Sequence, residues 1–255
     1  MNGDSARTVR VAAGANGVVG KIEGQGRLLV ETSMPDLSPF MVEDVSGMAL
    51  GHLNGGLLRA HGLDEGGDVE RGVGGHDEMW FAVRDLAFGV GRHPDVEPPP
   101  SISRPEADRR LPEVPPPVEW MLSLLANLLI IEFRAELTFA DTQHLLGHPF
   151  FDDRRRQADE AIEVVERIRT DEEIHVRSLR LYLGELWELT FTTDSGPVAA
   201  CSILEPYWRD LVRWATVDQP GLDAERQRTL LREHCAAASD PDALWARLRE
   251  LDEVG

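Results

Sequence analysis

The chain has 255 residues, with 45 acidic side chains against 26 basic ones, so its formal charge is −19 and its sequence pI is about 4.8. This length supports one or two domains with a sizeable core, and the content of 42% apolar and 28% charged residues is ordinary for a globular protein. The acidity argues against a broad nucleic-acid or anionic-membrane surface, because both require clustered positive charge. Lys21 is the one lysine of the chain, which restricts lysine-based Schiff-base or phosphate-loop chemistry to its neighbourhood.

Cysteine content and hydropathy indicate the compartment. Cys201 and Cys235 are too few for a disulfide framework or a zinc cluster, which suits a reducing cytosol. The N-terminal residues hold no apolar stretch of the kind a secretory signal needs, and the longest apolar run, 124–131, is too short to span a bilayer. We expect a soluble cytoplasmic protein that binds neither nucleic acid nor membrane.

The first half of the chain is expected to contain one pair of helices. Residues 1–39 are rich in glycine and carry short β-branched runs, which predicts an irregular or hairpin-like N-terminal arm. Helical spacing within 40–91 predicts the first helical pair, over 40–61 and 76–88. Nine of the sixteen prolines fall within 92–117, which predicts an extended, proline-rich strap between two helical halves.

The second half carries the stronger helical periodicity. It predicts a second helical pair and a following helix within 118–216, and C-terminal helices within 217–255. The predicted bounds are 118–140, 155–190, 205–216, 222–235 and 241–253. Pro206 suits the first turn of the third of these helices. The fold class is therefore mostly α, and we expect the parts to form one compact domain.

Two polar residues interrupt the apolar stripe of the long helix over 155–190. Between Ile168 and Leu179, Glu172 and His175 occupy stripe positions where a hydrophobic residue is due. The Glu-x-x-His spacing places both side chains on one helix face, one turn apart. A carboxylate on a buried face must be neutral, paired or metal-bound, because burial of an isolated charge is costly.

The preceding helix shows the same anomaly. Glu132 interrupts a stripe of leucine, alanine and phenylalanine, and Glu136 lies one turn further along. Two antiparallel neighbouring helices would direct Glu132, Glu172 and His175 into a shared apolar interior, with Glu136 as a further candidate. These acids differ from most of the 45 because they stand where leucines are expected.

A Glu on one helix and Glu-x-x-His on its partner resembles the half-site of the ferritin-like di-iron carboxylate bundles. The resemblance covers about residues 118–190. It implies a ferritin-like helical bundle with two iron ions, or manganese and iron. It further implies that Glu132 is the first-helix ligand, Glu172 a bridging or terminal carboxylate, and His175 a terminal nitrogen ligand.

The N-terminal half lacks a second Glu-x-x-His. Its two remaining candidates are His52, on the stripe of the first helix, and His76, at the start of the second. Either the other half-site is irregular, or the protein holds one metal ion, or it holds none. The heme-oxygenase-like di-metal bundles are a related family, through Glu136 and His144. Glu43 and Asp85 are further candidates, and Glu78 lies on the same predicted helix as Asp85.

The candidate metal ligands are therefore Glu132, Glu172, His175, Glu136, His76 and His52. An oxygen-rich site with few histidines favours iron or manganese. We expect a non-heme di-iron oxygenase or oxidase that uses O2 and an electron donor to oxidise a small organic substrate by N-oxygenation or hydroxylation. In outline it resembles the amine N-oxygenases of bacterial secondary metabolism.

The alternative is a metal-free helical binding or interaction protein in which Glu172 and His175 form a structural buried pair. Its Glu–His contact would then be structural and would carry no chemistry. A homodimer is compatible with the long amphipathic helix in both cases.

Overall fold

The computed structural model describes residues 17–91, 96–99, 101–105 and 108–222, together with 225 and 229. The chain divides into two compact units, Met1–Trp208 and Arg209–Gly255. The predicted C-terminal helices over 222–235 and 241–253 fall almost entirely outside the described residues. Among the residues that are described, no helix combines the length and the apolar character needed to cross a membrane.

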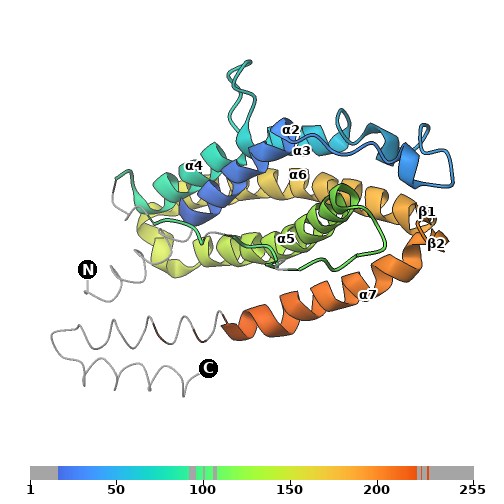
Figure 1. Ribbon diagram of the computed structural model, residues 1–255. Coiled ribbons are helices and arrows are strands. Elements are labelled where there is room, and N and C mark those ends of the chain that lie inside the picture. The colour runs from blue at the N-terminus through green and yellow to red at the C-terminus, as the bar shows by residue number, and fades with distance from the viewer. Residues whose placement is uncertain are drawn as a thin grey trace. The chain divides into compact units, whose positions relative to one another are not determined.

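The first unit is mostly helical, as the sequence predicts, and its longest element is α6, Arg155–Trp187. α5, Pro116–Leu146, lies beside α6 (Figure 1) and is joined to it by a short connection that contains the 3-10 turn η4, Pro149–Arg154. Because the connection is short, the two helices run antiparallel. α3, Leu57–Gly66, and α4, His76–Phe88, also pack against α6.

Apolar side chains from α4, α5 and α6 form one continuous core. Trp80 of α4 and Phe139 of α5 have ring centroids 5.0 Å apart, and both side chains are fully buried beside Val165 and Ile168 of α6. Burial of each such side chain contributes about 1.5–3 kcal/mol. The core therefore fixes three helices relative to one another, and the polar interruptions of their stripes lie on the faces that these helices turn inward.

Residues 17–31 are helical, where the sequence predicts an irregular or hairpin-like arm over 1–39; residues 1–16 of that arm lie outside the described residues. Residues 17–23 form a helix, followed by the 3-10 turn η1, Gly24–Arg27, and by α2, Leu28–Glu31. Close packing explains the difference. A Cβ at Gly20 would lie 2.9 Å from Phe81, and a Cβ at Gly26 would lie 2.5 Å from Glu65. Glycine thus allows this segment to lie directly on α3 and α4, and such tertiary contacts outweigh β propensity.

The helix predicted over 40–61 is also wrong in its bounds. This region holds two 3-10 turns, η2, Ser38–Phe40, and η3, Ala49–His52, and α3 begins only at Leu57, after Gly56. Four glycines between 47 and 56 explain the interruption, because glycine disfavours a helix interior. The predicted helix over 76–88 matches α4 in both bounds.

A β-hairpin connects α6 to the last described helix. β1, Thr190–Thr193, pairs antiparallel with β2, Gly196–Ala199. α7, Ala200–Arg213, begins directly after the hairpin, so Pro206 lies inside this helix and not in its first turn as predicted. The backbone amide of Ala200 donates to the carbonyl of Leu189 at 2.9 Å, which ties the start of α7 to the end of α6. A π-helical segment, Trp214–Asp218, follows.

The described part of the proline-rich segment between α4 and α5 contains no helix or strand as far as Pro115. α5 begins at Pro116, within the predicted strap, because proline fits the first turn of a helix, where its missing N–H costs nothing. Residues 101–105 of this segment also line a cavity beside α5.

Candidate metal centre

Three of the four predicted polar residues of α5 and α6 are buried. Glu132, Glu172 and His175 have exposed fractions of 4%, 2% and 1%. Each lies in the apolar stripe of its helix, and the antiparallel packing of α5 on α6 brings both stripes to the same interior.

α3 supplies two residues that sequence reasoning missed. His61 and Glu65 are buried and lie one turn apart, in the spacing His-x-x-x-Glu. This spacing is the only feature of the sequence that could have pointed to His61 and Glu65. It lies among glycines, where the residues around it form no clear apolar stripe, so a search for a second Glu-x-x-His passes over it.

Two more side chains complete the cluster. His76, the first residue of α4 and a predicted ligand, is buried. Glu23, which sequence reasoning also missed, comes from the N-terminal helix, and its carboxylate lies 3.9 Å from His76 Nδ1. The N-terminal residues of the cluster therefore come from three separate segments and not from one Glu-x-x-His helix.

Glu65 stands at the centre of the cluster. Its Oε1 atom lies 3.5 Å from His61 Nε2, 3.5 Å from His76 Nδ1 and 3.3 Å from His175 Nδ1. The rings of His61 and His175 stack, with centroids 3.7 Å apart. Nitrogens of three histidines from three helices thus face one carboxylate oxygen.

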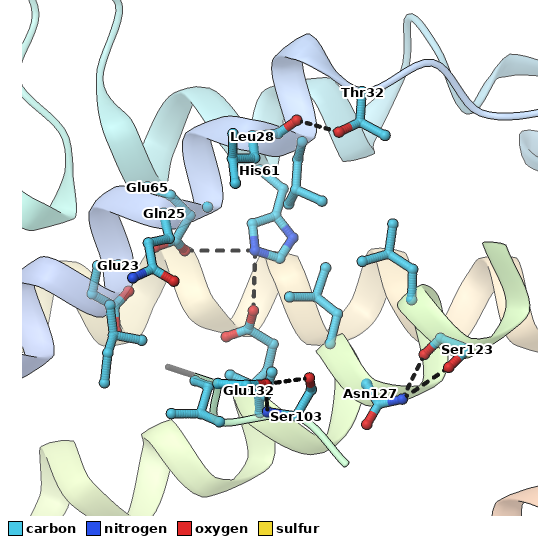
Figure 2. Close-up of a pocket in the computed structure, with 18 of the residues that line it drawn as sticks. Glu23, Gln25, Leu28, Thr32, His61, Glu65, Ser103, Ser123, Asn127 and Glu132 are labelled. Carbon is cyan, nitrogen blue, oxygen red and sulfur yellow. Dashed lines mark hydrogen bonds and ion pairs between the residues drawn. The ribbon is translucent and has the colours of Figure 1, made fainter. Parts of the chain in front are cut away.

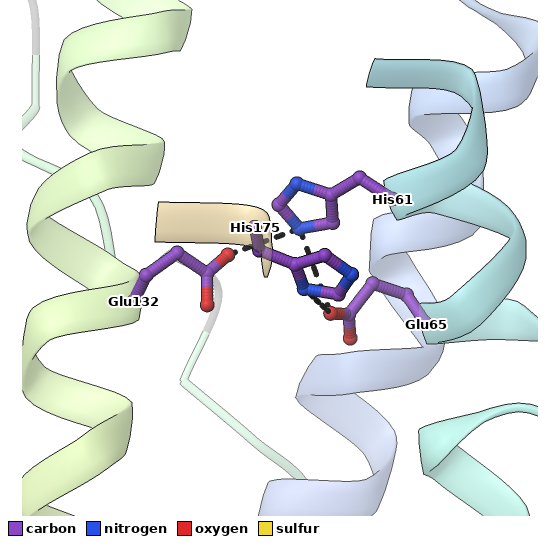
Figure 3. Close-up of side chains that lie close together, drawn as sticks. All are labelled: His61, Glu65, Glu132 and His175. Atoms are coloured by element: carbon purple, nitrogen blue, oxygen red, sulfur yellow. Dashed lines mark ion pairs between the residues drawn. The ribbon is translucent and has the colours of Figure 1, made fainter. Parts of the chain in front are cut away.

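The other carboxylates surround this centre. Glu132 Oε1 lies 3.0 Å from His61 Nε2, and Figure 2 shows His61 between Glu65 and Glu132. Glu172 contacts two histidines, with Oε2 at 2.9 Å from His175 Nδ1 and Oε1 at 3.2 Å from His76 Nδ1. Figure 3 shows the side chains from α3, α5 and α6 pointing toward one another.

Two aspartates hold the outer nitrogens of the histidines. His175 Nε2 lies 3.2 Å from Asp64 Oδ2, and His76 Nε2 lies 3.5 Å from Asp171 Oδ2. Both aspartates are nearly half exposed and directly precede the inward glutamates Glu65 and Glu172. A carboxylate on the outer nitrogen fixes the orientation of the ring and leaves Nδ1 facing the cluster.

Burial and mutual contacts shift the pKa values strongly. Burial, with the nearby charge of Glu172, raises the pKa of Glu132 to about 8. Burial would also raise the pKa of Glu172, but its contacts with His175 and His76 outweigh this and lower it to about 2. The pKa of His175 rises to about 12, because Asp64, Glu172 and Glu65 stabilise the charged ring against the cost of burial.

Burial also opposes ionisation of Glu65, yet contacts with His175, His61 and His76 hold its pKa well below the usual value. Glu23 is different: burial and the nearby charge of Glu65 raise its pKa well above the usual value. In the absence of an ion the carboxylates are therefore divided, with Glu65 and Glu172 ionised against the histidines and Glu23 and Glu132 favouring the protonated form.

Several buried polar atoms of the cluster lack a hydrogen-bond partner of good geometry among the described residues. They are both ring nitrogens of His61, Nδ1 of His76, Oε1 of Glu65 and Oε1 of Glu172. Buried polar atoms are normally satisfied, and each such group merits an explanation. Except for His61 Nδ1, these atoms all lie in the short contacts described above, so they face a common interior.

The cluster contains two overlapping sets of four potential ligand atoms. One comprises His61, Glu65, Glu132 and His175, and the other Glu23, Glu65, His76 and Glu172, with the atoms of each set within 4.8 Å of one another. Nitrogen and oxygen ligands at about 2.0–2.2 Å from one ion lie at most about 4.4 Å apart. Each set is thus close to the size that one ion requires, and Glu65 belongs to both.

Two sequence-predicted ligands, Glu136 and His52, lie outside the cluster, as does His144. Glu136 forms an ion pair with Arg169, whose Nε donates to Glu136 Oε2 at 3.0 Å, because its helix position turns it toward the exposed edge between α5 and α6. His52 is exposed at the end of η3, since the glycines around it prevent the predicted helix from turning it inward. His144, proposed with Glu136, is exposed on the last turn of α5.

A cavity of about 650 Å³ opens against the cluster. His61, Glu65, Glu132 and Glu23 form part of its wall (Figure 2). The rest comes from the N-terminal helix, η1 and α2, from residues 101–105 and from one stripe of α5 that runs from Trp120 to Ala135 at helical spacing. Its volume lies within the range of about 300–1,000 Å³ that small-molecule sites occupy.

Comparison of the chain with protein-family models, with curated proteins and with solved structures gives no match. Function therefore has to be inferred from the residues of the cluster and of the cavity beside it.

Proposed function

We propose that the cluster is a dinuclear metal centre. Its seven side chains supply the two overlapping ligand sets, and Glu65, common to both, is the residue that would bridge two ions. The ligand set has four carboxylates and three histidines, and such oxygen-rich sets suit iron or manganese. The buried, unsatisfied nitrogen and oxygen atoms support the proposal, because a bound cation would satisfy them.

A carboxylate-bridged pair of iron ions, when bound, supplies the electrons that activate O2. We propose a di-iron, or manganese–iron, oxygenase or oxidase that oxidises a small organic molecule and receives electrons from a donor. The observation that carries this function is the cavity, because its wall includes Glu132, His61 and Glu65. A substrate in the cavity would lie directly against the ligands, whereas an iron-storage site has no need of such a space.

The chain's own residues would prepare this chemistry in two ways. Asp64 and Asp171 hold the outer nitrogens of His175 and His76, so the inner nitrogens are already aimed at the cluster before an ion enters. His61, Glu65 and Glu132 line the cavity, which makes the cavity the favoured route for the substrate.

O2 consumption by protein reconstituted with Fe(II) tests this function. Mixing the reduced protein with O2 in a sealed cell should consume O2 and produce an absorption band between about 300 and 400 nm, the region typical of oxidised carboxylate-bound iron centres. Glu65→Gln should abolish both signals, and Glu136→Gln, which alters only a surface ion pair, should leave them intact. Iron-loaded protein that neither consumes O2 nor absorbs in this range contradicts the proposal.

One observation favours the metal-free alternative. His175 Nδ1 and Glu172 Oε2 are 2.9 Å apart, an ordinary hydrogen bond that requires no ion. A helical binding protein with a structural Glu–His pair would keep its fold and its ligand after His175→Gln and would bind no iron. The metal content of the wild-type protein distinguishes the two functions.

A further inference from the structure

The cavity beside the cluster has an apolar wall over much of its length. Its large apolar side chains come chiefly from α2 and α5, and they include Leu28, Leu29, Trp120, Leu124, Leu128 and Ile131. On α5 they belong to the stripe that also carries Glu132. At 1.5 Å per residue, Leu124 lies about 12 Å from Glu132 along the helix axis. Apolar surface therefore leads along α5 directly to the cluster.

Two of these apolar side chains are exposed to solvent. Leu28 is 60% exposed and Trp120 is 45% exposed, and both line the cavity. Each Å² of apolar surface that leaves water contributes about 25 cal/mol to binding. A ligand with an apolar body would cover part of both side chains, so their exposure favours such a ligand.

The neutral polar side chains in the described lining are Gln25, Thr32, Ser101, Ser103, Ser123 and Asn127. All of them except Gln25, which is exposed, have hydrogen bonds to protein groups. Asn127 Oδ1 accepts from the backbone amide of Arg104 at 2.9 Å, and Asn127 Nδ2 donates to the backbone carbonyl of Ser123 at 2.8 Å (Figure 2). A polar head group would have to replace such bonds, and an exchange of one hydrogen bond for another gains little free energy.

Charge in the described lining belongs mainly to the cluster. The cluster residues in the wall are Glu23, His61, Glu65 and Glu132. The remaining charged side chain is Arg104, which is buried and has partners within the protein. Its guanidinium lies 4.6 Å from the ring centroid of Tyr207, a residue outside the lining. An ionic ligand would thus bury its charge along the apolar stretch without a partner, which is costly.

We propose that the cavity binds an uncharged, long-chain aliphatic molecule. Its body lies along the apolar stripe of α5, against Leu124 and Leu128, and one of its ends lies beside His61 and Glu132. The stripe and the exposed apolar side chains supply the binding free energy, and the shortage of open polar partners selects against ions. This inference rests on the proposed function in one respect, because that function makes the bound molecule the substrate.

Calorimetric titration of the full chain with a series of alcohols tests the proposal. Burial of one methylene group contributes about 0.8 kcal/mol, so affinity should rise about fourfold per added carbon from 1-butanol through 1-hexanol to 1-octanol. Octanoate and octylammonium should bind at least about tenfold more weakly than 1-octanol. The protein is treated with chelator first, so that no head group can bind an ion. An affinity that does not depend on chain length, or tighter binding of either ion, overturns the proposal.

Variants on one helix locate the bound molecule. Leu128→Gln places a polar group in the wall and should weaken 1-octanol about tenfold. Leu137→Gln is the matched control, since Leu137 lies on the same helix but is 68% exposed and outside the lining, and it should leave the affinity unchanged. Ile131→Gln provides a second test in the wall if Leu128→Gln fails to fold. If the wall variants bind 1-octanol as tightly as Leu137→Gln does, the assignment to this cavity is wrong.

The metal content of untreated samples separates this inference from the proposed function. If the protein binds 1-octanol selectively but holds no iron after reconstitution, the di-iron function fails and the aliphatic site stands. If the protein holds iron and consumes O2 but shows no dependence on chain length, the aliphatic site fails and the metal centre stands.

Discussion

Removal of the carboxylate that both ligand sets share should empty both metal positions. Glu65 is the one residue common to the two sets, whereas Glu132 belongs only to the first and Glu23 only to the second. Glu65→Gln should therefore reduce the metal content from about two ions per chain to near zero. Glu132→Gln and Glu23→Gln should each retain about one ion.

The size of the effect follows from the number of ligands. Each set has four ligand atoms, and the four-ligand zinc sites of zinc-finger peptides, taken as a guide, bind their ion with about 10–16 kcal/mol. One ligand is then worth about 3 kcal/mol, or about two orders of magnitude in the dissociation constant. Glu65→Gln removes one ligand from both ions, so both bind more weakly. Glu132→Gln and Glu23→Gln each remove a ligand from one ion only.

Elemental analysis after anaerobic reconstitution with Fe(II) and desalting measures these stoichiometries. Glu136→Gln is the matched control, since Glu136 lies on the same helix as Glu132 but only pairs with Arg169 at the surface. If Glu65→Gln keeps one or two ions, or if Glu132→Gln and Glu23→Gln lose as much as Glu65→Gln, the two-set interpretation is wrong.

Three further predictions follow from the cluster and its supports. Gly26→Ala places a Cβ 2.5 Å from Glu65, the shared glutamate, and should lower both the metal content and the melting temperature. Gly184→Ala is the control: its Cβ would meet nothing within 4 Å, so it should raise the melting temperature slightly. Equal melting temperatures for the two variants would contradict the packing argument. Asp64→Asn should weaken iron binding about 10- to 100-fold in a competition titration, because the variant no longer holds the outer nitrogen of His175. An unchanged iron affinity would show that Asp64 does not position His175. In chelator-treated protein, the pKa of His175 is raised to about 12 and that of Glu132 to about 8, so both stabilise the fold at low pH. Chemical denaturation should therefore show stability falling between about pH 6.5 and 8, with a shallower fall in Glu132→Gln; a rise in stability with pH contradicts this.

The residues of α5 and α6 that matter could be identified from the sequence because these helices have long, regular stripes. Glu132, Glu172 and His175 interrupt those stripes, and all three are buried in the cluster. Helical periodicity reports which face of an element is buried, and a polar residue on that face is conspicuous. The same reasoning misjudged Glu136, since one turn of shift along a helix also moves a side chain toward its edge.

The N-terminal part of the cluster could not be predicted for a physical reason. Glu23, His61, Glu65 and His76 lie on short elements that are separated by glycines, and no single periodic pattern relates them. Their convergence depends on tertiary packing, in particular on the close approach of the N-terminal segment to α3 that Gly26 permits. A glycine-rich sequence usually indicates irregular structure, but here Gly26 allows a helical segment to lie against the buried carboxylate of Glu65.

The number of iron ions bound by the wild-type protein tests the central claim most directly. Full-length protein, reconstituted anaerobically with Fe(II) and desalted, should contain about two iron ions per chain, one for each ligand set. A content near zero would show that the buried glutamates and histidines form a structural network without a metal, and would contradict the proposed dinuclear centre.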